Sequence, residues 1–482
     1  MDAPSSDLHF VLFPMMLQGH MLPMVDIARL LAQNGVTVTI ITTPINANRI
    51  KPVIDRAIES NLKIQILELQ LPFAEAGLPE GCENFDLLPS AAYIGNLLKA
   101  TKMLENPAER MLQALNPPPS CIISDGGLPW TTDIANRLNI PRIIFYGPGC
   151  FAFLCIHIVN NTNILEEIDS NTEYFPLPGL PDRIEITKPQ ASSWGKGKTK
   201  ETIEAFEETQ EAEKGAYGIV VNSFEELEPK YVEEFAKAKC KKVWCIGPVS
   251  LCNKSLQDVS ERGNKAAIEP HDCLKWLDIM DPRSVIYVCL GSLSYASTKQ
   301  AIEVGIGLEK TSEEFERWIL EEGYEERVID RGLLVRGWAP QILILSHQAI
   351  GGFVTHCGWN SVLEGICVGV PFVTWPHFAD QFLNERFIVD VLKIGVKIGA
   401  EVPITIRDKF EVMVKRENIK KAVESLMNED EEGEARRKRA KEFGEMAKRA
   451  MEEGGSSKVN IKLLIQDIVE EISKKNKPQY NV

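Results

Sequence analysis

The stretch WAPQILILSHQAIGGFVTHCGWNSVLEGICVGVPFVTWPHFADQ, residues 338–381, shows most clearly how this chain folds. An apolar run at 350–355 leads directly into the turn HCGWNS at 356–361, where a helix is expected to begin. A second apolar run, 370–375, precedes Asp380 and Gln381. A strand, a helix and a strand in this order predict one unit of a parallel α/β sheet.

The first half of the chain repeats this pattern. Residues 9–13 form a short apolar strand, 21–34 an amphipathic helix that Gly35 ends, and 36–42 a strand rich in β-branched residues. Right-handed crossovers build such units into a parallel sheet. Further strands are predicted at 121–124, 142–145, 218–222 and 241–248, and a helix at 131–138.

A second domain of the same kind is predicted, because 482 residues exceed what one hydrophobic core usually supports. Its series starts with a strand at 285–290 and a helix at about 298–308. The amphipathic segment 461–472 is expected to dock back across the first domain. We therefore predict an α/β fold with two facing Rossmann-like domains, bounded as follows: 1–248, the first domain; 249–270, a linker; 271–460, the second domain; 461–482, a C-terminal helix and tail.

One strand of the second domain is missing from this pattern. After the helix that ends near residue 308, a further apolar strand is required, but residues 309–323 read as a charged helix. The next apolar segment, 332–336, is predicted to be the following strand and leads into Trp338. We therefore expect the second sheet to lack one strand near residue 310, where strand order would place it close to the centre.

Composition narrows the possible functions. A net charge of −15 argues against nucleic acid, whose phosphates need a basic surface, and against electrostatic attachment to a membrane. No apolar run reaches the ~18 residues of a membrane span, and Asp2 and Asp7 lie where a signal peptide would be positively charged. The 11 cysteines are scattered and form no CxxC pair, which indicates neither a disulfide framework nor a zinc site. These features predict a cytoplasmic protein with reduced thiols.

The segment 338–381 resembles the signature box of the plant family-one UDP-glycosyltransferases, from its opening WAPQ through HCGWNS to its closing DQ. Residues 9–43 and the PLPGLP segment at 176–181 are similar to the subgroup that glucosylates triterpenoids, flavonoids and phytohormones. The resemblance implies a GT-B fold and an enzyme of specialised metabolism, with UDP-glucose as co-substrate and no metal or other cofactor. We expect a monomer whose partners are the UDP-sugar and a small-molecule acceptor.

The diphosphate site is expected where the helix begins after the apolar run 350–355. Pyrophosphate favours the amino end of a helix at the carboxyl edge of a parallel sheet. A simpler alternative is that Asn360 and Ser361 only cap the helix. By resemblance, His356, Asn360 and Ser361 hold the diphosphate, helped by Ser292 from the first turn of the domain. Gly358 and Trp359, in the same turn as His356, are also expected to be donor-binding residues.

Other residues of the box are expected to bind the uridine. By resemblance, Trp338 stacks on the uracil, the backbone of Ala339 meets the base, and Gln341 reaches the ribose. Glu364, one helical turn after Ser361, is placed where a carboxylate accepts from both ribose hydroxyls. The alternatives are that Trp338 is a core residue and that Glu364 is a solvated surface residue.

The remaining expected contacts concern the sugar and the acceptor. By resemblance, Asp380 and Gln381 bind the sugar hydroxyls, and a glutamine at the final position favours glucose. Loops in the first domain, around 71–89, 147–153 and 185–194, are expected to bind an apolar acceptor.

A base must take the acceptor's proton, because a hydroxyl is a poor nucleophile at neutral pH. His20, in the turn after the first strand, is the histidine in the family's catalytic position, and helix capping is its alternative role. Asp125 ends the strand at 121–124 and by resemblance stabilises the imidazolium. Asp133 is a rival that is expected on a helix surface. The implied reaction is displacement of UDP with inversion.

Other enzyme classes fit less well. A dinucleotide-binding dehydrogenase needs GxGxxG after a strand, and the nearest match, at 305–307, lacks the third glycine. The segment at 195–199 lacks the leading glycine of a P-loop, and Gly291-Ser292 does not provide the GxSxG of a serine hydrolase. The main alternative is a non-catalytic homologue, impaired by the missing strand, that binds a UDP-sugar or another small molecule.

Overall fold

The computed structural model describes residues 8–192, 200–293, 295–296, 300, 332–404, 409–410 and 414–475. The chain divides into two compact units, each made of segments that are distant in sequence. Unit 1 comprises 1–154, 196–253 and 449–482, and unit 2 comprises 155–195 and 254–448. The division differs from the expected bounds in that 155–195 group with unit 2 and 449–460 with unit 1.

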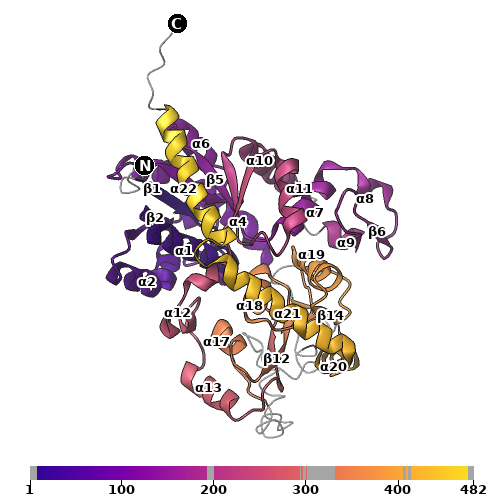
Figure 1. Ribbon diagram of the computed structural model, residues 1–482. Helices are drawn as coiled ribbons and strands as arrows, with labels where there is room; N and C mark the ends of the chain where they lie inside the picture. The colour runs from indigo at the N-terminus through magenta and orange to yellow at the C-terminus, as the bar shows by residue number, and fades with distance from the viewer. Residues whose placement is uncertain are drawn as a thin grey trace. The chain divides into compact units, whose positions relative to one another are not determined.

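Unit 1 is built on a parallel sheet with the strand order β3-β2-β1-β4-β5-β8-β9. Strands β1, β2 and β5 of this sheet are labelled in Figure 1. All residues of the interior strand β1 are buried, which suits the apolar run from Phe10 to Phe13. The strand order reverses between β1 and β4, and doubly wound sheets bind ligands at the carboxyl ends of the strands beside such a reversal. The strands are β1 (His9–Phe13), β2 (Thr37–Thr42), β3 (Ile64–Glu68), β4 (Cys121–Asp125), β5 (Arg142–Tyr146), β8 (Gly218–Val221) and β9 (Lys242–Cys245).

The hydrophobic core of unit 1 includes the C-terminal helix α22 (Ser456–Lys475). Its residues Ile461, Leu464 and Ile468 are fully buried in one cluster with residues of β1 and α1. An ion pair of 2.5 Å between Lys242 and Asp467 also joins the helix to β9. The other helices are α1 (Gln18–Gln33), α2 (Pro44–Glu59), α3 (Phe73–Ala76), α4 (Ile94–Lys102), α5 (Glu105–Gln113), α6 (Thr131–Arg137), α7 (Cys150–Asn161, which crosses the boundary between the units), α10 (Lys200–Lys214) and α11 (Pro229–Lys239).

Unit 2 contains a parallel sheet with the order β10-β12-β13-β14. Trp375 and Val373 are fully buried in its core. The strands are β10 (Val285–Cys289), β12 (Ile350–Thr355), β13 (Phe372–Thr374) and β14 (Gly395–Lys397), beside the pairs β6 (Tyr174–Pro176) with β7 (Glu185–Thr187) and β11 (Tyr295–Ala296) with β15 (Lys409–Phe410). The helices are α8 (Ile164–Glu167), α9 (Lys188–Ser192), α12 (Leu256–Ser260), α13 (Pro270–Asp278), α17 (Gln341–Leu345), α18 (Trp359–Val368), α19 (Gln381–Arg386), α20 (Arg416–Met427) and α21 (Glu431–Ala450).

The prediction of a strand at 332–336 is wrong, because these residues form no strand. β10 pairs with β12 on one edge, and the described residues provide no strand for its other edge, so all five residues of β10 are partly exposed. Without a neighbour in the described part of the chain, 332–336 has no ladder in which to place its backbone hydrogen bonds. The predicted absence of a strand near residue 310 falls on 301–331, outside the described residues.

None of the helices in the described part of the chain has both the length and the apolar character that crossing a membrane requires. Within the same residues, no group of three or more His, Cys, Asp or Glu is arranged to hold a metal ion.

Candidate active site

His20 and Asp125 meet at the carboxyl edge of the unit 1 sheet. His20 lies in the first turn of α1, directly after β1, and Asp125 is the last residue of the neighbouring strand β4. The Nδ1 atom of His20 lies 2.5 Å from Oδ2 of Asp125. Because β1 and β4 flank the reversal of strand order, the pair occupies the position where sheets of this kind bind ligands.

The surroundings of His20 limit the roles it can take. Helix α1 begins earlier than predicted, after the N-cap residue Leu17, and has no side-chain cap, so His20 is not a capping residue. The Oδ1 atom of the buried Asp125 accepts the N–H of Gly127 at 2.9 Å, which fixes the carboxylate. An ionised carboxylate accepts the Nδ1 proton of the imidazole, and this tautomer carries its lone pair on Nε2, as a general base requires.

Tyr146 is the last residue of β5, and the residue that follows it, Gly147, borders the imidazole of His20. A Cβ atom at Gly147 would lie 3.8 Å from Cε1 of His20, so the backbone of this residue borders the imidazole. The hydroxyl of Tyr146 points elsewhere and donates to Glu213 at 2.7 Å, and burial raises the pKa of Tyr146. Asp133 is exposed on α6, where the sequence placed it.

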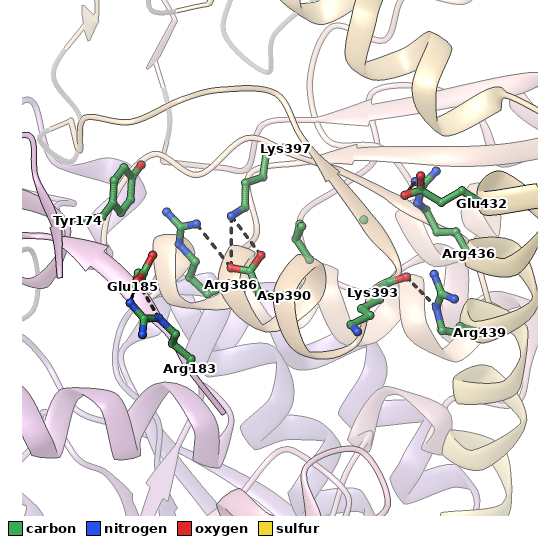
Figure 2. Close-up of a pocket in the computed structure, with 12 residues that line it drawn as sticks. Tyr174, Arg183, Glu185, Arg386, Asp390, Lys393, Lys397, Glu432, Arg436 and Arg439 are labelled. Carbon is green, nitrogen blue, oxygen red and sulfur yellow. Dashed lines mark hydrogen bonds and ion pairs between the residues drawn. The ribbon is translucent and has the colours of Figure 1, made fainter. Parts of the chain in front are cut away.

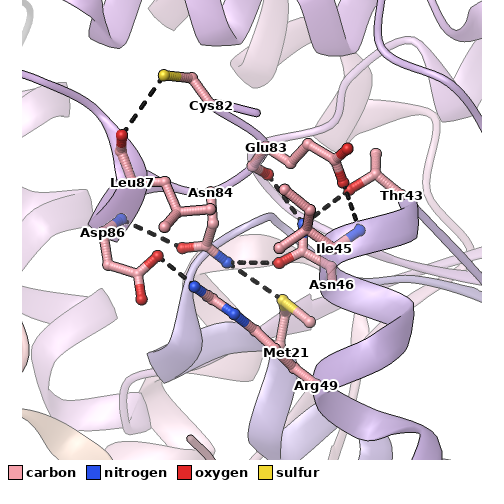
Figure 3. Close-up of polar contacts among 10 residues, drawn as sticks. All are labelled: Met21, Thr43, Ile45, Asn46, Arg49, Cys82, Glu83, Asn84, Asp86 and Leu87. Atoms are coloured by element: carbon pink, nitrogen blue, oxygen red, sulfur yellow. Dashed lines mark hydrogen bonds and ion pairs between the residues drawn. The ribbon is translucent and has the colours of Figure 1, made fainter. Parts of the chain in front are cut away.

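The loop that contains Glu83 and Asn84, before α4, is held against α2 by hydrogen bonds of buried amide side chains (Figure 3). Nδ2 of Asn84 donates to Oδ1 of Asn46 at 2.8 Å, and Nδ2 of Asn46 donates to the carbonyl of Glu83 at 2.8 Å. The next residue, Phe85, donates its N–H to the carbonyl of Met16 at 3.0 Å, in the loop that leads to His20. These bonds fix part of the expected acceptor loop 71–89 relative to the start of α1.

In unit 2, the turn after β12 places His356 between two glycines. A Cβ atom at Gly291, which has φ +82°, would lie 2.6 Å from Nε2 of His356, and one at Gly358 would lie 3.1 Å from Cε1. The imidazole therefore leaves no room for a side chain at either position. Burial lowers the pKa of His356 to about 4, so that the ring is neutral at pH 7 and meets an anion as a hydrogen-bonding group.

The first turn of α18 presents backbone groups of the HCGWNS motif. Its N-cap residue is Gly358, so Asn360 and Ser361 lie inside the helix and are not the cap. The first N–H groups of a helix have no partner within it and favour anions. Trp359 is buried with its ring 6.1 Å from that of Phe387, so its side chain belongs to the core and only its backbone faces the turn.

Three of the expected donor residues lie together beside this turn. Nε2 of Gln341 donates to Oε2 of Glu364 at 2.7 Å and to the hydroxyl of Ser361 at 3.0 Å. Glu364 is buried, not a solvated surface residue, and its Oε1 accepts from Nη1 of Arg262 at 2.5 Å. The network therefore holds the carboxylate of Glu364 one helical turn after Ser361, beside the turn that is expected to bind the diphosphate.

Trp338 is hydrogen-bonded to residues 262 and 267, which lie within the expected linker 249–270. Its indole N–H donates to the carbonyl of Arg262 at 3.3 Å, and its own carbonyl accepts the N–H of Ala267 at 2.8 Å. A Cβ atom at Gly263 would lie 2.7 Å from Cε2 of the indole. Sequence reasoning missed Arg262 and Gly263, whose only signal is an Arg-Gly pair within a polar run.

The sugar-binding candidates lie at the start of α19. Oδ2 of Asp380 accepts from Asn384 at 2.8 Å. Oε1 of Gln381 accepts the N–H of His377 at 2.8 Å, which leaves the side-chain NH₂ as the group that can reach a hydroxyl. Ser292 and Ala339 are partly exposed, in the turn after β10 and before α17 respectively.

A separate cavity of about 810 Å³ in unit 2 is lined mainly by charged residues (Figure 2). Several of these charges are already paired, since Asp390 contacts Lys397 at 3.2 Å and Arg386 at 3.5 Å. None of the expected donor residues lines it, so this cavity is distinct from the candidate donor site. Its lining residues are Tyr174, Arg183, Glu185, Arg386, Val389, Asp390, Lys393, Gly395, Lys397, Glu432, Arg436 and Arg439.

Comparisons with known proteins identify the family of the chain. Residues 207–435 match the family model described as UDP-glucoronosyl and UDP-glucosyl transferase. UDP-glycosyltransferase 73E1 of Stevia rebaudiana is 60% identical, with 98% of each chain covered. UDP-glycosyltransferase 73C25 of Barbarea vulgaris is 50% identical, with 97% of each chain covered.

Solved structures show the same fold. Glycyrrhiza uralensis UGT73P12, complexed with glycyrrhetinic acid 3-O-monoglucuronide, is 34% identical with a TM-score of 0.89 and 97% of each chain covered. Arabidopsis thaliana UGT89C1, complexed with UDP-L-rhamnose, is 26% identical with a TM-score of 0.70, covering 95% of this chain and 98% of that one. The prediction of two Rossmann-like domains of GT-B type is confirmed, and the alternative of a non-catalytic homologue is not supported. The chain belongs to the plant family-one UDP-glycosyltransferases, enzymes that transfer a glycosyl group from a UDP-sugar to small plant metabolites.

Proposed function

We propose that this enzyme transfers glucose from UDP-glucose to a hydroxyl group of an apolar plant metabolite, a triterpenoid, flavonoid or phytohormone. The observation that carries the proposal is the network of Gln341, Ser361 and Glu364 beside Trp338. It offers a flat indole for the uracil and a carboxylate for the ribose hydroxyls, next to a helix start suited to a diphosphate.

Diphosphate binding has support from His356. Its Nδ1 atom is buried and has no hydrogen-bond partner among the described residues. A buried polar atom without a partner is unusual in a folded protein, and a phosphate oxygen would supply one. In the proposal, the diphosphate contacts come from the turns after β10 and β12: Ser292, His356, Gly358, Asn360, Ser361 and the backbone of Trp359.

The remaining donor contacts follow the same logic. Gln341 and Glu364 bind the ribose, and the backbone of Ala339 meets the base beside Trp338. Asp380 and Gln381 bind the sugar hydroxyls, and Gln381 is the basis for proposing glucose.

His20 is the proposed general base. Its Nε2 takes the acceptor's hydroxyl proton while the oxygen attacks the anomeric carbon and the bond from that carbon to the diphosphate breaks. UDP leaves with the electron pair of the broken bond, and attack from the opposite side inverts the anomeric configuration. Asp125 stabilises the imidazolium through the 2.5 Å contact at Nδ1. No metal or further cofactor takes part in the proposed reaction.

The proposed setting of the enzyme rests on sequence alone. A monomer in the cytoplasm fits the acidic charge and the 11 scattered cysteines. The domain bounds proposed from the sequence, 1–248 and 271–460 with a linker at 249–270, place both catalytic residues in the first domain and all donor residues in the second.

A panel of acceptors tests the function. Wild-type protein is incubated with UDP-glucose and with triterpenoids, flavonoids and phytohormones, including glycyrrhetinic acid, and products are detected by mass spectrometry. We expect a product about 162 mass units heavier than its acceptor, which corresponds to one hexosyl group on a ligand of the pocket. The same panel with UDP-glucuronate and UDP-galactose tests the sugar. A folded protein that binds UDP but forms no product with any acceptor would contradict the proposal.

A further inference from the structure

Arg262 contacts two predicted donor residues at once. Its guanidinium forms a 2.5 Å ion pair with Glu364, and its carbonyl accepts the indole N–H of Trp338 at 3.3 Å. The side chains of the ion pair are 8% and 5% exposed for Arg262 and Glu364 respectively. One residue therefore joins the group expected to hold the ribose to the group expected to hold the uracil.

We propose that Arg262 is a positioning residue of the donor site, which orients Glu364 toward the ribose hydroxyls and Trp338 toward the base. This inference rests on the proposed UDP-sugar site and adds the part of the chain that assembles it. The segment from Arg262 to Ala267 holds Trp338 at both its side chain and its backbone, since the N–H of Ala267 also donates to the carbonyl of Trp338 at 2.8 Å.

The chemistry of the carboxylate supports this role. An ionised carboxylate has about four acceptor positions on its two oxygens. Arg262 and Gln341 use one position on each oxygen of Glu364, which leaves acceptor capacity for the two ribose hydroxyls. A buried carboxylate without a cationic partner is costly, so without Arg262 the side chain of Glu364 would turn away from this position. This change removes an acceptor that the ribose needs.

Substitution at residue 262 separates positioning from general stability. Arg262→Met keeps the apolar stem and removes the charge, and Arg262→Lys keeps a charge that can pair with one carboxylate oxygen. Glu364→Gln serves as the matched control for loss of the ribose acceptor. Isothermal titration calorimetry in the absence of acceptor gives the Kd of each protein for UDP and for 2′-deoxy-UDP.

We expect wild type to bind UDP more tightly than 2′-deoxy-UDP, because Glu364 accepts from the missing hydroxyl. Arg262→Met should weaken UDP binding about ten- to a hundredfold and bring the ratio of the two Kd values close to one, as in Glu364→Gln. Arg262→Lys should recover part of the UDP affinity and part of the preference for UDP over 2′-deoxy-UDP. With saturating UDP-glucose, kcat should change by less than about threefold while KM for UDP-glucose rises, since the bound substrate and the transition state lose the same interaction with the ribose.

The outcomes are distinguishable. Wild type that does not bind UDP would overturn the proposed function itself. If wild type binds UDP more tightly than 2′-deoxy-UDP, and Arg262→Met shows the same ratio of the two Kd values, only the role of Arg262 would be overturned. Tighter UDP binding by Arg262→Met would also overturn it, because it would show that the guanidinium competes with the ribose. If Arg262→Met does not fold, Arg262→Lys decides, since an unchanged ratio and an unchanged KM in that variant would mean that the geometry of the guanidinium has no role.

Discussion

Gly263→Ala is expected to displace the indole of Trp338 and to weaken UDP binding. The new Cβ atom would lie 2.7 Å from Cε2 of the indole, and closer still to Cζ2, whereas ordinary contacts begin at 3.4 Å. The difference between 3.4 and 2.7 Å means that the ring must move by at least about 0.7 Å. Stacking of a base on an aromatic ring contributes about 1–3 kcal/mol, so its loss corresponds to about a 5- to 150-fold rise in Kd for UDP.

A second glycine provides the control. Gly263 has φ +102°, and this backbone conformation by itself makes alanine unfavourable by about 1–2 kcal/mol. Gly179 in the same unit has φ +71°, but no atom lies within 4 Å of the position of its Cβ. Gly179→Ala therefore has the unfavourable backbone conformation but no clash of the new Cβ atom with another side chain, and the Kd of this variant for UDP should equal that of wild type.

The assay is calorimetric titration of both variants with UDP, beside their melting temperatures. Both variants should melt at a lower temperature than wild type, but only Gly263→Ala should lose UDP affinity. Wild-type affinity in Gly263→Ala would refute the proposed stacking on Trp338, because the ring cannot remain in place beside the added Cβ atom.

Three further predictions concern the base, a buried carboxylate and the acceptor loop. Asp125→Asn should lower kcat by about 10- to 150-fold, because an amide does not stabilise the imidazolium as a carboxylate does, and an unchanged steady-state kcat would argue against the pair. Burial raises the pKa of Glu385 from 4.5 to about 7. Since the folded protein then binds this proton more tightly than the unfolded chain, the free energy of unfolding should fall by about 3 kcal/mol as pH rises from about 4.5 to 7. Glu385→Gln, compared with wild type by urea unfolding across this range, should lack that part of the pH dependence. Asn84→Ala should lower stability by about 1–3 kcal/mol and raise KM for the acceptor, leaving the Kd for UDP unchanged; an unchanged KM would separate the loop from the acceptor.

Local sequence was sufficient to predict β1, which precedes the turn that leads to His20, and β4, which ends at Asp125. Both strands are mainly apolar, and short apolar runs predict buried parallel strands. The contact between His20 and Asp125 depends on β1 and β4 being neighbours, a property of strand order that the spacing of residues along the chain does not contain. The pairing of His20 with Asp125 was instead predicted from the resemblance to a family.

Local sequence was not sufficient where a segment depends on a distant partner. Residues 332–336 have the composition of a strand but form none, because the described residues provide no neighbouring strand for them. The proposed role of Arg262 depends on its contacts with Glu364 and Trp338, which lie far along the chain, so its own segment had only the composition of a polar linker. The burial of Trp359 could not be predicted either, since its position in the motif does not show which way its side chain points.

The most direct test of the proposed mechanism is the rate of glucoside formation by His20→Ala, with the acceptor that the panel identifies. We expect kcat to fall by ~10²-fold or more, the range for loss of a general base, while the Kd for UDP stays at the wild-type value. The unchanged Kd is expected because the residues proposed to bind UDP all belong to unit 2, whereas His20 belongs to unit 1. Wild-type turnover by His20→Ala would contradict the assignment of His20 as the base that activates the acceptor.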